Sequence, residues 1–158
     1  MTKKKRQKQS VLHLLSLVLG LVSVVMIFLP AVNYSTFKDV TDRLTGLEVI
    51  FGVRIVESLK AKVFEFSIMY LLPYVLALGG LVVAVLSYLA GGNKLFAFIS
   101  AGAFIASAVF FFLYPSFLIL TKFSLLIKEN FSLGIGSIIG GISSALAGFF
   151  SLGQVVKK

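Results

Sequence analysis

The chain contains no cysteine and no tryptophan, and only six of its 158 residues are acidic. Without cysteine it can form neither a disulfide nor a thiolate metal site. Charged residues make up 13% of the sequence, about half the share in an average globular domain. Hydrophobic residues make up 58%, and the mean hydropathy is +1.02. This composition is typical of a chain embedded in lipid and leaves no length for a separate soluble domain, so we expect one transmembrane domain over residues 1–158.

Four apolar runs are long enough to cross a bilayer, because a helix needs about 20 apolar residues to span roughly 30 Å of hydrocarbon. They cover about residues 11–30, 66–90, 95–115 and 133–153. The sequence therefore predicts an all-α membrane protein with a four-helix transmembrane bundle. A small extracytoplasmic segment, 31–65, joins the first two spans, and a short outer loop, 116–132, joins the last two.

The first ten residues carry five basic side chains and no acidic one, directly before the first apolar run. A signal peptide has an apolar region of about 7–15 residues followed by a small-residue cleavage site. The run here is longer and ends in Leu29-Pro30-Ala31, so we interpret it as a retained span. Lys and Arg next to the first span stay on the cytoplasmic side. We therefore expect a multi-pass protein of the cell membrane with both termini cytoplasmic.

The basic N-terminus also suggests a binding partner. Basic stretches of about five to eight residues occur in nucleic-acid sites, and they also contact the anionic head groups of membrane lipids. Because this stretch adjoins a predicted span, we expect it to contact membrane lipids, and we expect no nucleic-acid binding.

The last span carries small residues at intervals of four. On a helix they fall on one face, opposite the isoleucine and phenylalanine side chains. In a bilayer, small residues let helix backbones approach closely, so this face is predicted to be the packing face of the bundle. The predicted helix-packing residues are Gly136, Gly140, Gly141, Ser144 and Gly148 in the last span, Gly80 and Ala84 in the second, and Gly20 in the first.

His13 is the only histidine, and no carboxylate occurs at its predicted depth. A proton relay or a metal site needs partners that converge on the imidazole, so we interpret His13 as structural, bonded to a hydroxyl or water near the cytoplasmic interface. The motif Gly134-Ile135-Gly136-Ser137 superficially resembles the sequence around a nucleophilic serine. Such a serine needs a base at the same depth, and His13 is predicted to lie at the opposite membrane face. We expect no enzymatic activity, no cofactor and no metal.

The segment 31–65 holds five of the six acidic residues and is the only long polar stretch. Its parts Asn33–Thr36 and Asp39–Gly46 are rich in turn-forming residues and are predicted to be turns and loop. Apolar residues alternate with others over Leu47–Val56, which favours a short strand. A four-residue apolar spacing in the same stretch leaves a helix open. From Val56 onward the charges favour an amphipathic helix that leads into the second span.

The phrase Thr45-Gly46-Leu47-Glu48-Val49-Ile50-Phe51-Gly52 lies between Phe28-Leu29-Pro30 and Leu71-Leu72-Pro73. In this arrangement it resembles small four-span membrane proteins of Gram-positive-type bacteria and mollicutes, over about the first half of the chain. That family carries no assigned activity, so the resemblance implies the four-span topology and no reaction. The layout also resembles claudin-like proteins by analogy, although the tryptophan and the cysteine pair of the claudin signature are absent.

Two functions from different classes remain open. The favoured hypothesis is a non-enzymatic structural or interaction role, as an accessory or scaffold protein whose outer segment contacts another membrane protein, a lipid, a wall component or a second copy. The alternative is a small oligomeric channel or transporter subunit. The spans hold no catalytic or coupling group, and this favours the first hypothesis. Apolar side chains of the outer segment must be covered by something: they could pack on the protein's own helix ends, insert into the outer head-group layer or bind a partner. The candidate partner-binding residues are Glu48, Val49, Phe51 and Arg54.

Overall fold

The computed structural model describes residues 3–35, 41–51, 68–116 and 131–156. In chain order, the elements are α1 (Lys3–Val25), the short 3-10 helix η1 (Met26–Phe28), β1 (Pro30–Ser35), β2 (Thr41–Thr45), α2 (Gly46–Phe51), α3 (Ile68–Leu89), α4 (Lys94–Phe112), β3 (Phe131–Leu133) and α6 (Ile135–Val156). Four of the helices are long and apolar enough to cross a membrane, which confirms the four predicted apolar helices.

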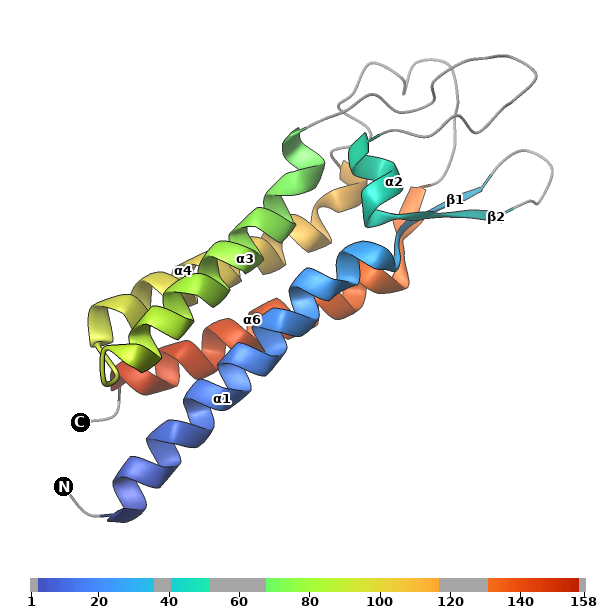
Figure 1. Cartoon of the computed structure of the whole chain (residues 1–158). Coiled ribbons are helices and arrows are strands. Elements are labelled where there is room, and N and C mark those ends of the chain that lie inside the picture. Colours follow the sequence, from blue (N-terminus) through green and yellow to red (C-terminus); the bar gives the residue numbers. More distant parts are fainter. Residues whose placement is uncertain (1–2, 36–40, 52–67, 117–130, 157–158) are drawn as a thin grey trace.

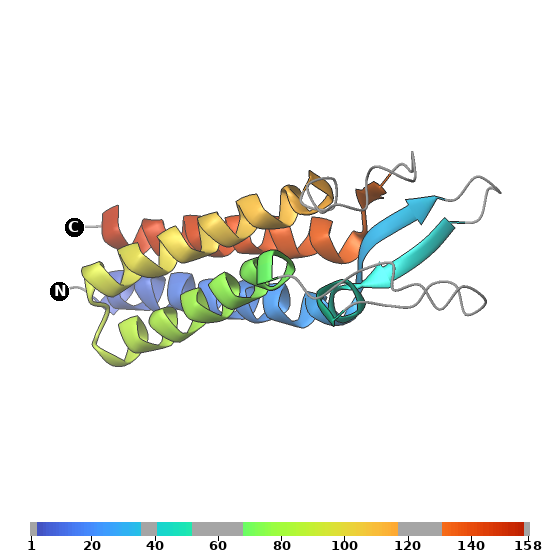
Figure 2. The ribbon, with the colours of Figure 1, turned by 90° about the horizontal axis from the view of Figure 1, so that it is seen from above.

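The four long helices lie side by side (Figures 1 and 2). The helix α6 packs against both α1 and α4, and α3 packs against the same two helices from the other side. The beginning of α1, the end of α6 and the α3–α4 connection lie at one end, and the strands and α2 lie at the other (Figure 1). The connection between α3 and α4 is short because Gly91 and Gly92 take positive φ angles of 70° and 86°, which glycine adopts at little cost.

Small residues in the long helices leave room for aromatic rings. The Phe104 ring on α4 is fully buried and lies against Gly20 of α1 and Gly80 of α3. A Cβ added at Gly20 would lie 2.6 Å from Phe104 Cζ, and one added at Gly80 would lie 3.1 Å from Phe104 Cδ1. Since both distances are shorter than ordinary van der Waals contact, glycine at these two positions lets three helices meet around one ring.

The strands form an antiparallel sheet in the order β2-β1-β3. The prediction of turns and loop over Asn33–Thr36 and Asp39–Gly46 is therefore wrong for the described parts of those stretches. The local composition favours turns, but β1 gains a second strand at Phe131–Leu133, nearly 100 positions further along the chain. Burial of Val32 and Leu44, which are paired across β1 and β2, holds the ladder on the helix ends.

The prediction of a strand over Leu47–Val56 is also wrong for its described part, because residues 46–51 form the helix α2. The neighbours Val49 and Ile50 are both fully buried. In a strand these two side chains would point to opposite faces, whereas on a helix both can reach one core. Residues 52–56 and the expected amphipathic helix after Val56 lie outside the described residues.

Candidate functional site

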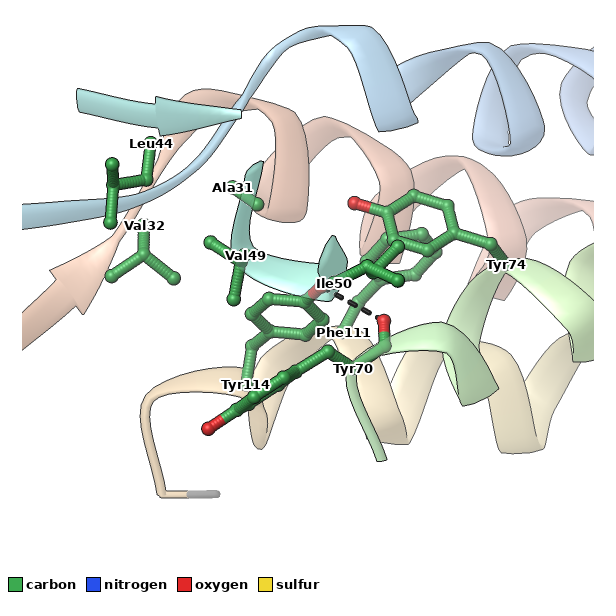
Figure 3. Packing of buried hydrophobic residues seen from close by; sticks show 9 residues of the cluster. All are labelled: Ala31, Val32, Leu44, Val49, Ile50, Tyr70, Tyr74, Phe111 and Tyr114. Atoms are coloured by element: carbon green, nitrogen blue, oxygen red, sulfur yellow. Dashed lines mark hydrogen bonds between the residues drawn. The ribbon is translucent and has the colours of Figure 1, made fainter. Parts of the chain in front are cut away.

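The strands β1, β2 and β3 and the helix α2 sit together at the end of the long helices that lies away from the termini (Figure 1). We call these four elements the cap. A cluster of buried residues joins the cap to the helices (Figure 3). Its members are Ala31, Val32, Leu44, Val49, Ile50, Tyr70, Tyr74, Phe111 and Tyr114. The cap is therefore packed on α3 and α4 through a shared core.

Three tyrosines give this core defined geometry. The Tyr114 hydroxyl donates a 2.9 Å hydrogen bond to the Tyr70 carbonyl oxygen (Figure 3). The Tyr74 ring meets the Phe111 ring edge to face, with centroids 5.0 Å apart. Edge-to-face packing of this kind fixes ring orientation as well as burying area.

The start of α6 is bonded directly to β1. The Ala31 carbonyl oxygen accepts two hydrogen bonds of 2.8 Å, from the Gly134 backbone N–H and from the Ser137 hydroxyl. A Cβ added at Gly136 would lie 2.9 Å from the Pro30 carbonyl oxygen and 3.0 Å from the Leu29 carbonyl oxygen. Because these contacts are with backbone, they leave little freedom for α6 to move relative to the cap.

The predicted partner-binding residues have different environments. Glu48 is exposed, but its carboxylate accepts hydrogen bonds of 2.7 Å from the Thr45 N–H and 2.9 Å from the Thr45 hydroxyl. The Glu48 N–H in turn lies 3.3 Å from Thr45 Oγ1, which makes a capping box at the start of α2. Val49 is fully buried and Phe51 is 68% exposed. Arg54 lies outside the described residues.

A cavity of about 250 Å³ opens where the cap meets the ends of the long helices, and it is lined by Pro30, Asn33, Arg43 and Ile135. Asn33 and Arg43 are opposite each other across β1 and β2. The Asn33 side-chain amide donates to the Leu133 carbonyl oxygen at 3.2 Å. Sequence reasoning missed this set as a site because its members come from three separate segments, and no local pattern connects them.

The predicted helix-packing residues are all buried. Gly140 lies against the Phe111 ring and Gly141 against Phe112, whereas Gly148 lies against Ile105 and the Ala101 carbonyl oxygen. Gly136 meets the start of β1, and Gly20 and Gly80 hold Phe104, as described above. Ala84 belongs to a second small core cluster with Phe104 and Ala147.

Buried serine hydroxyls connect the long helices to one another. Ser16 and Ser151 share a 2.7 Å hydrogen bond between α1 and α6, and Ser107 and Ser144 share one of 3.1 Å between α4 and α6. Ser100 of α4 and Ser151 of α6 also share a longer one of 3.5 Å. Further bonds join hydroxyls to backbone carbonyl oxygens of a neighbouring helix. The donors and acceptors are Ser107 to Pro73 O, Ser100 to Gly80 O, Ser16 to Ala147 O and Ser23 to Gly140 O. These hydroxyls are therefore used in holding helices together.

His13 is buried near the middle of α1, at the start of the first candidate span, where its ring meets Tyr88 of α3 edge to face at a centroid distance of 5.8 Å. Within the described ranges, no three metal-binding side chains come together. The His13 ring therefore lies in the kind of environment in which a packed aromatic ring is found. Comparison with known proteins adds no assignment, since no protein-family model matches the chain and no curated protein matches it.

Proposed function

We propose that this chain is a multi-pass protein of the cell membrane, whose four long helices cross the bilayer as a bundle with both termini cytoplasmic and the cap outside. Large apolar side chains are exposed on the outer surfaces of all four helices, among them Leu14, Val82, Ile105 and Ile142. In water such surfaces would be costly, whereas in lipid they are solvated. Five basic residues stand within the first ten positions, directly before the first candidate span, and a basic cluster next to the first span supports this orientation.

In this proposal the protein has a non-enzymatic structural or interaction role, exerted through the cap. The observation that carries it is the way the cap is built onto the bundle, with a shared aromatic core and with α6 bonded to β1. A cap held this firmly presents its exposed residues, such as Arg43 and Phe51, in a fixed arrangement. A fixed arrangement lowers the cost of ordering a surface when a partner binds. The partner in this proposal is another membrane protein or a second copy, and the basic N-terminus contacts anionic lipid head groups.

The bonded serines support this role over that of a channel or transporter subunit with a path inside one copy. A polar path needs groups that are available to a passing ion or solute. The hydroxyls of Ser16, Ser107 and Ser144 instead bond to one another, to Ser151 and to carbonyl oxygens. A path formed between copies would have to use the outer surfaces of the helices, which are largely apolar.

Because the chain has no cysteine, single-cysteine variants give an unambiguous test. Ser132→Cys places the thiol in the cap, and Lys94→Cys places it at the α3–α4 connection. A membrane-impermeant maleimide should label Ser132→Cys in intact cells and Lys94→Cys only after permeabilisation. The opposite labelling pattern would show that the orientation is reversed.

The same approach tests the interaction role. We expect a photoreactive maleimide on Ser132→Cys or Phe51→Cys to give a discrete cross-linked species, whereas the same reagent on Phe149→Cys in α6 should give none. Phe51 and Phe149 are matched controls, since both are 68% exposed. Discrete cross-links from the α6 position alone, with efficient labelling at both cap positions, would contradict a role for the cap.

A further inference from the structure

We infer that the cavity at the junction of cap and bundle binds the phosphate group of a membrane phospholipid, with the Arg43 guanidinium as its main ligand. This inference rests on the proposed placement of the long helices in the bilayer. It adds a defined lipid site on the outer side, separate from the contacts proposed for the basic N-terminus.

The polar wall of the cavity is suited to a phosphate. Arg43 is exposed, and its side chain forms no ion pair or hydrogen bond in the part of the chain that the structure describes. A guanidinium can donate two parallel hydrogen bonds to phosphate oxygens. Asn33 uses one of its two amide hydrogens on the Leu133 carbonyl oxygen, so the second remains for an oxygen of the ligand. Among the described residues, the lining of the cavity therefore offers one positive charge and up to three donors.

The apolar wall places the cavity at the depth of lipid head groups. Pro30 follows the first candidate span, which ends at Phe28, and Ile135 is the first residue of the last candidate span. Both residues therefore lie where hydrocarbon gives way to the interfacial region. Ile135 is 57% exposed, and Phe28 beside Pro30 is 64% exposed. A head group bound to Arg43 would thus have its acyl chains next to exposed apolar side chains.

The combination of the two walls distinguishes a phospholipid from a soluble anion. A free phosphate would use Arg43 and Asn33 but would leave Pro30 and Ile135 without a function. At about 250 Å³, the cavity lies just below the range of roughly 300–1,000 Å³ of sites that enclose a whole small molecule. It has the size for a head group whose acyl chains remain in the bilayer.

Native mass spectrometry of the full chain in mild detergent can test this, with phosphatidylglycerol as the probe. We expect Arg43→Gln to lower the affinity for phosphatidylglycerol about tenfold, as for the loss of one hydrogen-bonded charge. Arg43→Lys keeps the charge but loses the two parallel donors, so it should lower the affinity by less than Arg43→Gln. Ile135→Trp, which fills the cavity from its apolar side, should lower the affinity as well. Lys94→Gln is the matched control, since it removes one exposed positive charge at the other end of the molecule and should have no effect at this site.

Competition identifies the source of the phosphate. Glycerophosphoglycerol, which is the same head group without chains, and inorganic phosphate should displace the lipid only at concentrations far above that of the lipid. Displacement at equal concentration would overturn the assignment to a lipid. Unchanged lipid binding in both Arg43→Gln and Ile135→Trp would overturn the site itself. Either failure would leave the proposed membrane orientation intact, because cysteine labelling measures that separately.

Discussion

The replacement of Gly148 by alanine tests how closely the long helices pack. Gly148 is buried on the face of α6 that meets α4. A Cβ added there would lie 2.9 Å from Ile105 Cγ1 and 3.2 Å from the Ala101 carbonyl oxygen. Gly102 on α4 is the matched control, since a Cβ added at that position would meet nothing within 4 Å apart from its chain neighbours and the nearby backbone of its own helix.

The size of the expected difference in stability follows from the comparison of the two glycine sites. Both glycines lie in helix interiors, so replacement by alanine should stabilise the helix of each variant by the same amount, roughly 0.5–1 kcal/mol. At Gly148 this gain is opposed by an overlap of about 0.5 Å. The Ile105 Cγ1 atom moves only if χ1 changes, which a β-branched residue in a helix resists, and the Ala101 oxygen belongs to the backbone itself. The two helices must therefore separate slightly, which costs about 1–3 kcal/mol. We expect Gly148→Ala to be less stable than Gly102→Ala by this amount.

Stability can be measured by denaturant titration in a mild detergent, with far-UV circular dichroism as the signal, because the chain has no tryptophan for fluorescence. Gly102→Ala should equal or exceed the parent in stability, and Gly148→Ala should fall below it. Equal stability of the two variants would refute the close approach of α4 and α6 at this point.

Two further predictions concern hydrogen bonds. Ser107→Ala should lower stability by about 1 kcal/mol in the same titration, because Ser107 bonds both the Pro73 carbonyl oxygen and Ser144. Ser143→Ala should be neutral, since Ser143 forms no side-chain hydrogen bond in the described ranges. Glu48→Ala should weaken the start of α2 by about 0.5–1.5 kcal/mol, because it removes the hydrogen bonds that Glu48 accepts from Thr45. The loss is seen as faster hydrogen exchange at the Thr45 amide, whereas Glu48→Gln should retain most of the protection. Unchanged exchange in Glu48→Ala would show that the capping box is not needed.

The long helices could be predicted from the sequence because their signal is local. A run of about 20 apolar residues is already long enough to span the bilayer, and the glycine and serine spacing in residues 133–153 identifies one helix face without knowledge of any other helix. The described helix ends differ from the predicted spans by only a few residues, except that α1 begins at Lys3. At its N-terminal end α1 continues through the basic residues before position 11, which hydropathy alone excludes from the membrane span.

The cap and the cavity could not be predicted, because they depend on contacts between distant segments. Pro30–Ser35 contains residues that locally favour turns, and it becomes a strand by pairing with Phe131–Leu133. Likewise, the alternation after Leu47 is a true sequence pattern, yet burial of Val49 and Ile50 in the core that contains the tyrosines of α3 and Tyr114, just after α4, favours the helix. The cavity combines residues from β1, β2 and α6, so it exists only once that sheet is formed.

The shared core also determines how the cap can be studied. Three strands of six, five and three residues are too short to bury much surface of their own, and small isolated sheets are at best marginal in water. Most large side chains of the core come from α3, from the end of α4 and from the residues just after it, namely Tyr70, Tyr74, Phe111 and Tyr114. The Ala31 carbonyl oxygen, in turn, is bonded by the start of α6. The sheet therefore depends on the bundle for its fold, and a peptide of residues 30–51 lacks both β3 and the aromatic half of the core. Binding to the cap must accordingly be measured on the full chain in detergent or bilayer, where the helices that complete its core are present.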